Sequence, residues 1–174
     1  ISYHFGGKDQ LYRAVAVMVI GGMEARIRRR AGPVLGIVPA APAAALAALQ
    51  TLIETLVDVV VGPQEMRRVA RFVIREQMQP TAAFEVLFGT MSALHRTACG
   101  LFGRAAGLEA ESPSVRLRVF LLIGQTIFLR IAEVAVLRRM ELERYDEAFL
   151  NDVKAVLRQH VRLAVAAARE DVSS

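Results

Sequence analysis

The sequence predicts an all-α protein, and three observations carry this prediction. Alanine, leucine, valine and arginine dominate the chain, and all of these except valine favour helix. Apolar residues recur every three or four positions along most of the sequence, which is the period of a helix with one face in a core. Prolines and glycines separate many of these segments, where they end helices. With 174 residues, of which 54% are hydrophobic, the chain is long enough for one globular core.

The first predicted helix runs from Lys8 to Arg30, with an acidic residue in its first turn and arginines in its last, as the helix dipole favours. The pair Gly32-Pro33 is expected to end it. Gly21-Gly22 lies in its middle and lowers the helix propensity by roughly 1 kcal/mol per residue. We therefore expect a bend or a close helix contact at this pair.

Three further helices are predicted in the middle of the chain. After a loop, a helix restarts at Pro42 and ends at Gly62-Pro63. The next helix spans Gln64 to Met78, and another spans Pro80 to Phe102 and carries two apolar stripes. Because the last of these is so broadly apolar, it must be covered on more than one side.

The last two predicted helices are the most apolar. Ser112 is an N-cap with Pro113 at the first helical position, and the helix is expected to continue to about Met140. Asp146 is expected to cap the final helix, which spans Glu147 to about Arg169. Both helices carry apolar residues on opposite sides, and one side suffices to pack on the subunit. Since soluble monomers rarely expose so large an apolar patch, we predict a homodimer through these helices.

Composition narrows the class of protein. Cys99 is the only cysteine, so the chain forms no intrachain disulfide. The apolar segment 119–137 contains Gln125, Arg130 and Glu133, which are costly in lipid, so we expect a buried helix and no membrane partner. The net charge of +5 fits a nucleic-acid partner, but the basic residues are spread along the whole chain and do not decide the matter.

The sequence shows no pattern of catalytic or metal-binding residues. It lacks the Glu-x-x-His pair of di-iron bundles, a cysteine pair for zinc and a phosphate-binding glycine loop. Its three histidines, His4, His95 and His160, lie far apart. We therefore expect no enzymatic activity, no metal and no cofactor.

The N-terminal segment Tyr3-His4-Phe5-Gly6-Gly7-Lys8-Asp9-Gln10-Leu11 is predicted to hold the end of one helix, a tight turn and the start of another. It resembles the segment that ends the helix-turn-helix of tetracycline-repressor-like (TetR-family) transcriptional regulators. In that family an aromatic-rich segment closes the recognition helix, small residues turn the chain, and a K(D/E)xL motif opens the next helix. The stretch Arg75–Phe84 and the apolar segment from Ser112 also resemble the effector half of one TetR subgroup.

This resemblance implies a TetR-like fold with two parts. Residues 1–30 would be the end of the recognition helix and the connecting helix of the DNA-binding domain, and residues 31–174 the effector-binding and dimerisation domain. The first two helices, with most of the third and its base-reading residues, are expected upstream of Ile1. The resemblance also implies that Tyr3, His4 and Lys8 contact phosphates of double-stranded operator DNA. The alternative for Tyr3 is packing within the helix-turn-helix.

The family also places a small-molecule effector in a cavity among the middle helices. Polar groups on apolar faces are candidates, because burying them unpaired costs about 1–3 kcal/mol. Simpler interpretations stay open: a hydrogen-bonded core histidine for His95 and an ion pair for Arg75 with Glu76. Arg130 could pair with Glu133 across one turn or with a charge in the partner subunit. The candidate ligand-binding residues are Arg75, Glu76, Phe84, Phe88, Met91, His95, Gln125 and Phe128.

Together these features predict a cytoplasmic, ligand-responsive transcriptional regulator that binds DNA. We expect a homodimeric repressor that a small bulky or aromatic effector releases from a palindromic operator. Ligand binding would tilt the first predicted helix and change the spacing of the two recognition helices. The alternative is a helical ligand-binding or dimerisation module that does not bind DNA.

Overall fold

The computed structural model describes residues 7–173, with every side chain among them except those of residues 8, 9, 33, 34, 172 and 173. All regular elements in this part of the chain are helices, which confirms the all-α prediction. They are α2 (Lys8–Gly36), α3 (Pro42–Leu56) with its π-helical continuation η1 (Val57–Val61), α4 (Met66–Met78), α5 (Phe84–Ala106), α6 (Pro113–Ile131), α7 (Glu133–Arg139) and α8 (Glu147–Ser173).

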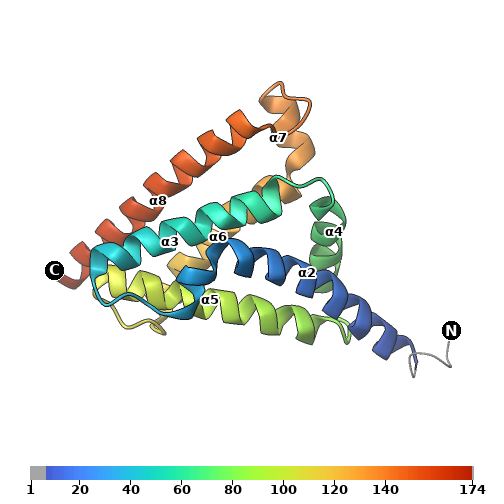
Figure 1. Cartoon of the computed structure of the whole chain (residues 1–174), viewed down its shortest axis with the longest axis horizontal. Helices are drawn as coiled ribbons and strands as arrows, with labels where there is room; N and C mark the ends of the chain where they lie inside the picture. Colours follow the sequence, from blue (N-terminus) through green and yellow to red (C-terminus); the bar gives the residue numbers. More distant parts are fainter. Residues whose placement is uncertain (1–6, 174) are drawn as a thin grey trace.

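Helix α3 is the centre of the fold. Figure 1 shows α2, α3 and α5 running side by side, with α8 along the other flank of α3 and α4 across the end that η1 forms. Leu49, Leu52 and Ile53 of α3 are buried in one core with Leu101 and Phe102 of α5. The segment Pro42–Val61 is apolar and long enough to cross a membrane, but 56% of it is buried inside the protein. Its apolar character is therefore accounted for by its central position in the core.

Helix α2 is longer than predicted. It continues through Gly32 and Pro33 and ends at Gly36, so the predicted end at Arg30 is wrong. A proline inside a helix costs a backbone hydrogen bond. Here the last turns also pack on the core, because Ala31 is fully buried and Leu35 lies against the buried cluster. This tertiary packing outweighs the local signal to stop.

The glycine pair in α2 does not bring another element close. The helix is continuous through Gly21 and Gly22, and a Cβ atom built on either one would meet no atom within 4 Å. The predicted close contact is therefore wrong for this part of the chain. Both glycines lie on an exposed face.

The helix that begins at Ser112 starts as predicted but breaks early. The Ser112 hydroxyl accepts a hydrogen bond from the Val115 amide, which confirms the N-cap. The predicted single helix to Met140 is wrong, because α6 ends before Ala132 and α7 leaves at an angle of 77°. The carbonyl of Leu129, which in a continuous helix serves the amide four residues later, accepts a hydrogen bond of 2.7 Å from the Tyr145 hydroxyl.

Two further helix ends match their predictions. The helix from Pro42 stops at Gly62, and the Asp146 carboxylate accepts a hydrogen bond of 2.8 Å from the Phe149 amide at the start of α8. Helix α5 spans Phe84–Ala106, so the predicted helix from Pro80 to Phe102 is wrong by four residues at each end. It ends at Gly107, which takes the left-handed conformation at φ 77°. The chain then folds back, and the amide of Leu108 donates to the carbonyl of Gly103.

This turn makes Gly103 intolerant of a side chain. A Cβ atom there would lie 2.8 Å from the carbonyl oxygen of Leu108 and 3.0 Å from the Cα of Ala110, and neither backbone atom can rotate away. We expect Gly103→Ala to lower the free energy of unfolding by about 1–3 kcal/mol through overpacking. Gly21→Ala is the matched control, because its site is open and helical, and it should raise stability by about 0.5–1 kcal/mol. Urea denaturation of both variants tests this, and equal stabilities would contradict the geometry.

Candidate functional site

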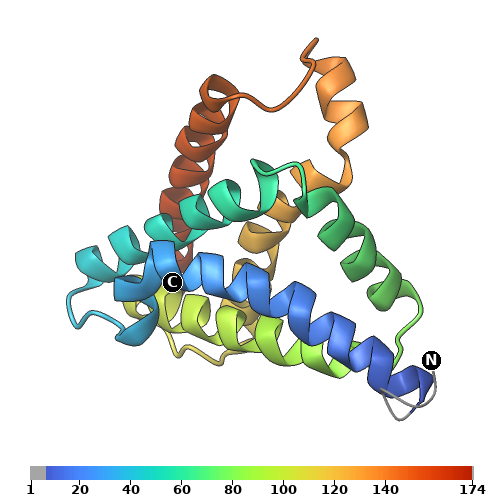
Figure 2. The same cartoon turned by 45° about the vertical axis from the view of Figure 1, so that its right-hand side comes forward.

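The residues predicted to contact DNA lie at the edge of the described structure. Tyr3 and His4 are outside the described residues. Lys8 is the first residue of α2, and the structure does not describe its side chain. Their proposed role therefore stays a prediction. Figure 2 shows that α2 runs from this end of the molecule into the body of the protein, alongside α5. A displacement of α2 would consequently move the N-terminal segment.

The corner between α4 and α5 is built around a buried carboxylate. Glu76 is fully buried, and its Oε2 accepts hydrogen bonds from the Thr81 amide at 3.0 Å and the Thr81 hydroxyl at 2.7 Å. Its Oε1 accepts from the Arg75 guanidinium at 3.2 Å, which confirms the predicted ion pair. Burial alone would raise the pKa of Glu76, but the hydrogen bonds from Thr81 and Arg75 hold it below its ordinary value. Glu76 therefore fixes the turn between the two helices in its ionised form.

Arg75 also connects this corner to α2. Its guanidinium lies 5.5 Å from the ring centroid of Tyr12 in α2 and 5.5 Å from that of Phe72 in α4. Both distances are in the range of cation–π attraction. The half-exposed arginine thus contacts two helices and a buried carboxylate.

The predicted aromatic residues of α5 lie beside this corner. The rings of Phe84 and Phe88 stack with centroids 5.9 Å apart, and Phe88 is 55% exposed. The Gln77 amide of α4 lies 3.8 Å from the sulfur of Met91. The structure therefore gathers five of the eight predicted ligand-binding residues around the α4–α5 corner: Arg75, Glu76, Phe84, Phe88 and Met91.

His95 is a core histidine that joins α5 to α6. Its ring stacks on Phe120 at 3.8 Å, and its Nε2 lies 3.1 Å from the carbonyl oxygen of Arg116. Since a carbonyl can only accept, Nε2 carries the proton and Nδ1 is free to accept from the Cys99 thiol at 3.5 Å. Burial raises the pKa of that thiol to about 11. The hydrogen-bonded core reading of His95 is confirmed.

The two predicted residues on α6 lie apart from the α4–α5 corner. Gln125 Oε1 is 2.7 Å from Nδ1 of His160, so this side chain points toward α8. Phe128 is 60% exposed on the outer side of α6. By contrast, Thr126 is fully buried, and its hydroxyl has no hydrogen-bond partner among the described residues. Thr126 is not among the predicted site residues, although it is, like Gln125, a polar residue within an apolar helix.

A buried network at the α6–α7 break joins three parts of the chain. Arg130 donates to Glu133 at 2.8 Å, as predicted, and also to the carbonyl oxygens of Val60 and Pro63 at 3.0 and 3.2 Å. Arg67 of α4 donates to both oxygens of Glu133, at 2.9 and 2.8 Å. The hydrogen bond from Arg67 outweighs burial and keeps the pKa of Glu133 below its ordinary value. The role of Arg67 could not be predicted from the sequence, because its partner lies 66 residues away.

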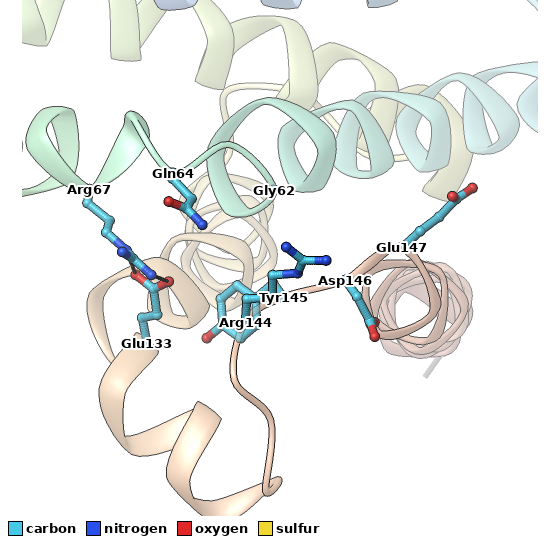
Figure 3. A pocket seen from close by; sticks show the side chains of 8 residues that line it. All are labelled: Gly62, Gln64, Arg67, Glu133, Arg144, Tyr145, Asp146 and Glu147. Carbon is cyan, nitrogen blue, oxygen red and sulfur yellow. Dashed lines mark hydrogen bonds and ion pairs between the residues drawn. The ribbon is translucent and has the colours of Figure 1, made fainter.

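A polar pocket of about 340 Å³ adjoins this network (Figure 3). In Figure 3 the Arg67–Glu133 pair forms one side and the Arg144 guanidinium lies between Gln64 and Glu147. Both charge signs are present, and no group of three or more metal-binding side chains occurs among the described residues. The pocket is lined by Gly62, Gln64, Arg67, Glu133, Arg144, Tyr145, Asp146 and Glu147.

Comparison with known proteins places the chain among the TetR-like transcriptional regulators, which confirms the family that the sequence predicts. More narrowly, residues 45–168 match the family of the C-terminal domain of the HTH-type transcriptional dual regulator CecR, and the chain belongs to this family. The HTH-type transcriptional dual regulator CecR of Shigella flexneri is 25% identical over 168 residues, which cover 94% of this chain and 74% of that protein. The chain is thus a transcriptional regulator of the CecR/TetR type.

The buried carboxylate at the α4–α5 corner makes a stability prediction. We expect Glu76→Gln to lower the free energy of unfolding by about 1–3 kcal/mol, because the amide cannot accept all three hydrogen bonds. Because the pKa of Glu76 is lower in the folded state, its contribution is present above the unfolded pKa and is lost as the pH falls through the folded value.

Urea titrations across the acid range should therefore show a flatter loss of stability for Glu76→Gln than for the wild type. Glu85→Gln, at an exposed position in the first turn of α5, is the control and should behave like the wild type. A Glu76→Gln variant as stable as the wild type at neutral pH would contradict the role of this carboxylate.

Proposed function

We propose that this regulator is a cytoplasmic homodimer that binds operator DNA through its N-terminal segment and releases it when a small effector binds. The observation that carries the proposal is the position of α2. This helix starts within the TetR-like segment and contacts both α3 and α5, so it joins the DNA-binding end to the body of the domain. Family membership supports the same role.

The outer sides of α6 and α8 support the proposed dimer. Phe128 and Ile131 of α6 are 60% and 52% exposed, and several large apolar neighbours are similarly exposed. A second copy of the chain would cover these side chains in a four-helix interface, as the sequence predicts. The other members of this outer apolar face are Leu117, Phe120, Leu121, Val156 and Leu163.

The α4–α5 corner supports the proposed effector class. Phe84, Phe88 and Met91 offer aromatic and thioether surface, and Arg75 adds a half-exposed guanidinium. A bulky or aromatic molecule with an acceptor group fits this chemistry. Because the oxygens of Glu76 already accept three hydrogen bonds, its proposed contribution is to hold Arg75 rather than to bind the ligand through a free oxygen.

Release of DNA would then follow from a difference in ligand affinity between two states. A ligand that favours one position of α4 shifts α2 through the contact of Arg75 with Tyr12. A tilt of α2 in each subunit changes the distance between the two DNA-binding ends. Since the two half-sites of an operator lie a fixed number of helical turns apart, the complex weakens.

The test of the function is whether the full-length protein binds the promoter region of its own gene. Fluorescence anisotropy measures this binding with and without bulky aromatic ligands. We expect Lys8→Ala to weaken binding to all DNA sequences alike and to reduce the salt dependence by about one counterion, as loss of one phosphate contact does. Arg104→Ala, in the last turn of α5, serves as the control. If the full-length protein binds no duplex, the protein is better described by the alternative, a helical ligand-binding or dimerisation module that does not bind DNA.

The proposed dimer makes a separate prediction. We expect Phe128→Arg to give a monomer, because a charge would replace an aromatic ring within the buried interface. Phe88→Arg is the matched control, since Phe88 is exposed to a similar extent, 55% against 60%, but lies on α5. Sedimentation velocity distinguishes the two states, and a dimeric Phe128→Arg variant would place the interface elsewhere.

A further inference from the structure

The α6–α7 break presents different residues to the two sides of the helix. Phe128, Ile131 and Val134 point outward and are 60%, 52% and 81% exposed. Arg130 and Glu133, which alternate with them, are buried in the network that reaches α4. A partner that packs on the exposed apolar residues therefore restrains the same helical turns that carry Arg130 and Glu133.

The inward side is tied to its surroundings by directional hydrogen bonds. The Arg130 guanidinium donates to the carbonyl of Val60, in the last turn of η1, and to that of Pro63, just after the end of η1. The Arg67 guanidinium donates to both oxygens of Glu133 in a bidentate pair. This geometry fixes the relative orientation of the two side chains as well as their distance. The position of α4 is thereby set by the position of the break.

Helix α4 is in turn connected to α2 at both of its ends. Glu65, just before α4, pairs with Arg26 at 2.8 Å, and Arg75 in its last turn lies over the Tyr12 ring. A continuous series of contacts thus leads from the outward face of the α6–α7 break, through α4, to the helix that approaches the DNA-binding end.

We propose that Arg67 is a positioning residue that couples dimer formation to the order of α4. The proposal rests on the proposed dimer through α6 and α8. Pairing of two subunits restrains the α6–α7 break and therefore the position of Glu133. Because Arg67 of α4 is paired with Glu133, the position of α4 is restrained as well. By linkage, whatever stabilises this position of α4 also strengthens the dimer to the same degree.

The test is hydrogen–deuterium exchange of the α4 amides, residues 66–78, in the whole chain at concentrations above and below the dimer dissociation constant. In the wild type, dimer formation should slow exchange in α4 by roughly 1.4-fold to fivefold, the range expected for a single partly exposed ion pair. Arg67→Met should abolish that difference and leave exchange in α5 unchanged. Arg67→Lys should restore part of it, because lysine keeps the charge but not the bidentate geometry.

Arg68→Met is the matched control. Arg68 is the next residue on α4, is exposed, and has no ion pair among the described residues. Its replacement should leave the difference between monomer and dimer intact. If Arg67→Met and Arg68→Met behave alike, or if α4 in the wild type exchanges equally fast in both states, the coupling is overturned while the dimer stands. A chain that is monomeric at every concentration overturns both the dimer and the coupling.

Discussion

The central constraint on this fold is that α3 must be enclosed. Its apolar residues point in several directions, and no single neighbour can remove all of them from water. Helices α2, α5 and α8 therefore pack along it, and α6 contacts it from a further side. Once these helices have used one side to cover α3, the outer sides of α6 and α8 remain apolar and open to solvent. The same demand for burial thus forms the core and leaves the surface that we assign to the partner subunit.

Charged residues in this apolar structure act where helices end. Glu76 closes the turn after α4, and Arg130 serves the carbonyls of Val60 and Pro63 at the end of the α3–η1 helix. Helix ends leave backbone groups without partners, so a buried ion is useful there because it satisfies several at once. Each such ion is also paired with an opposite charge, which offsets the cost of removing it from water. The contacts at the corners of the fold are consequently more polar and more directional than those in its apolar core.

Local chemistry explains which features the sequence could predict. The caps at Ser112 and Asp146, the stop at Gly62 and the pair between Arg130 and Glu133 all depend on neighbours within a few residues. The break at Ala132 depends on contacts from Tyr145 and Arg67, and the extension of α2 depends on packing against the core, so neither could be read from nearby residues. For the candidate site, helical periodicity predicted that Phe84, Phe88 and Met91 share one face of their helix, and their role in binding a ligand stays a prediction. It could not show that Gln125 points toward α8 or that Thr126 is buried.

The arrangement around Cys99 has a practical consequence. The thiol has no exposed surface and lies 3.5 Å from Nδ1 of His95, and its burial raises its pKa to about 11. The thiol is therefore protonated at neutral pH, and an alkylating reagent can reach it only when α5 separates from its neighbours. This single thiol is therefore a native reporter: the speed at which it is alkylated measures how often the interior opens, without any engineered label.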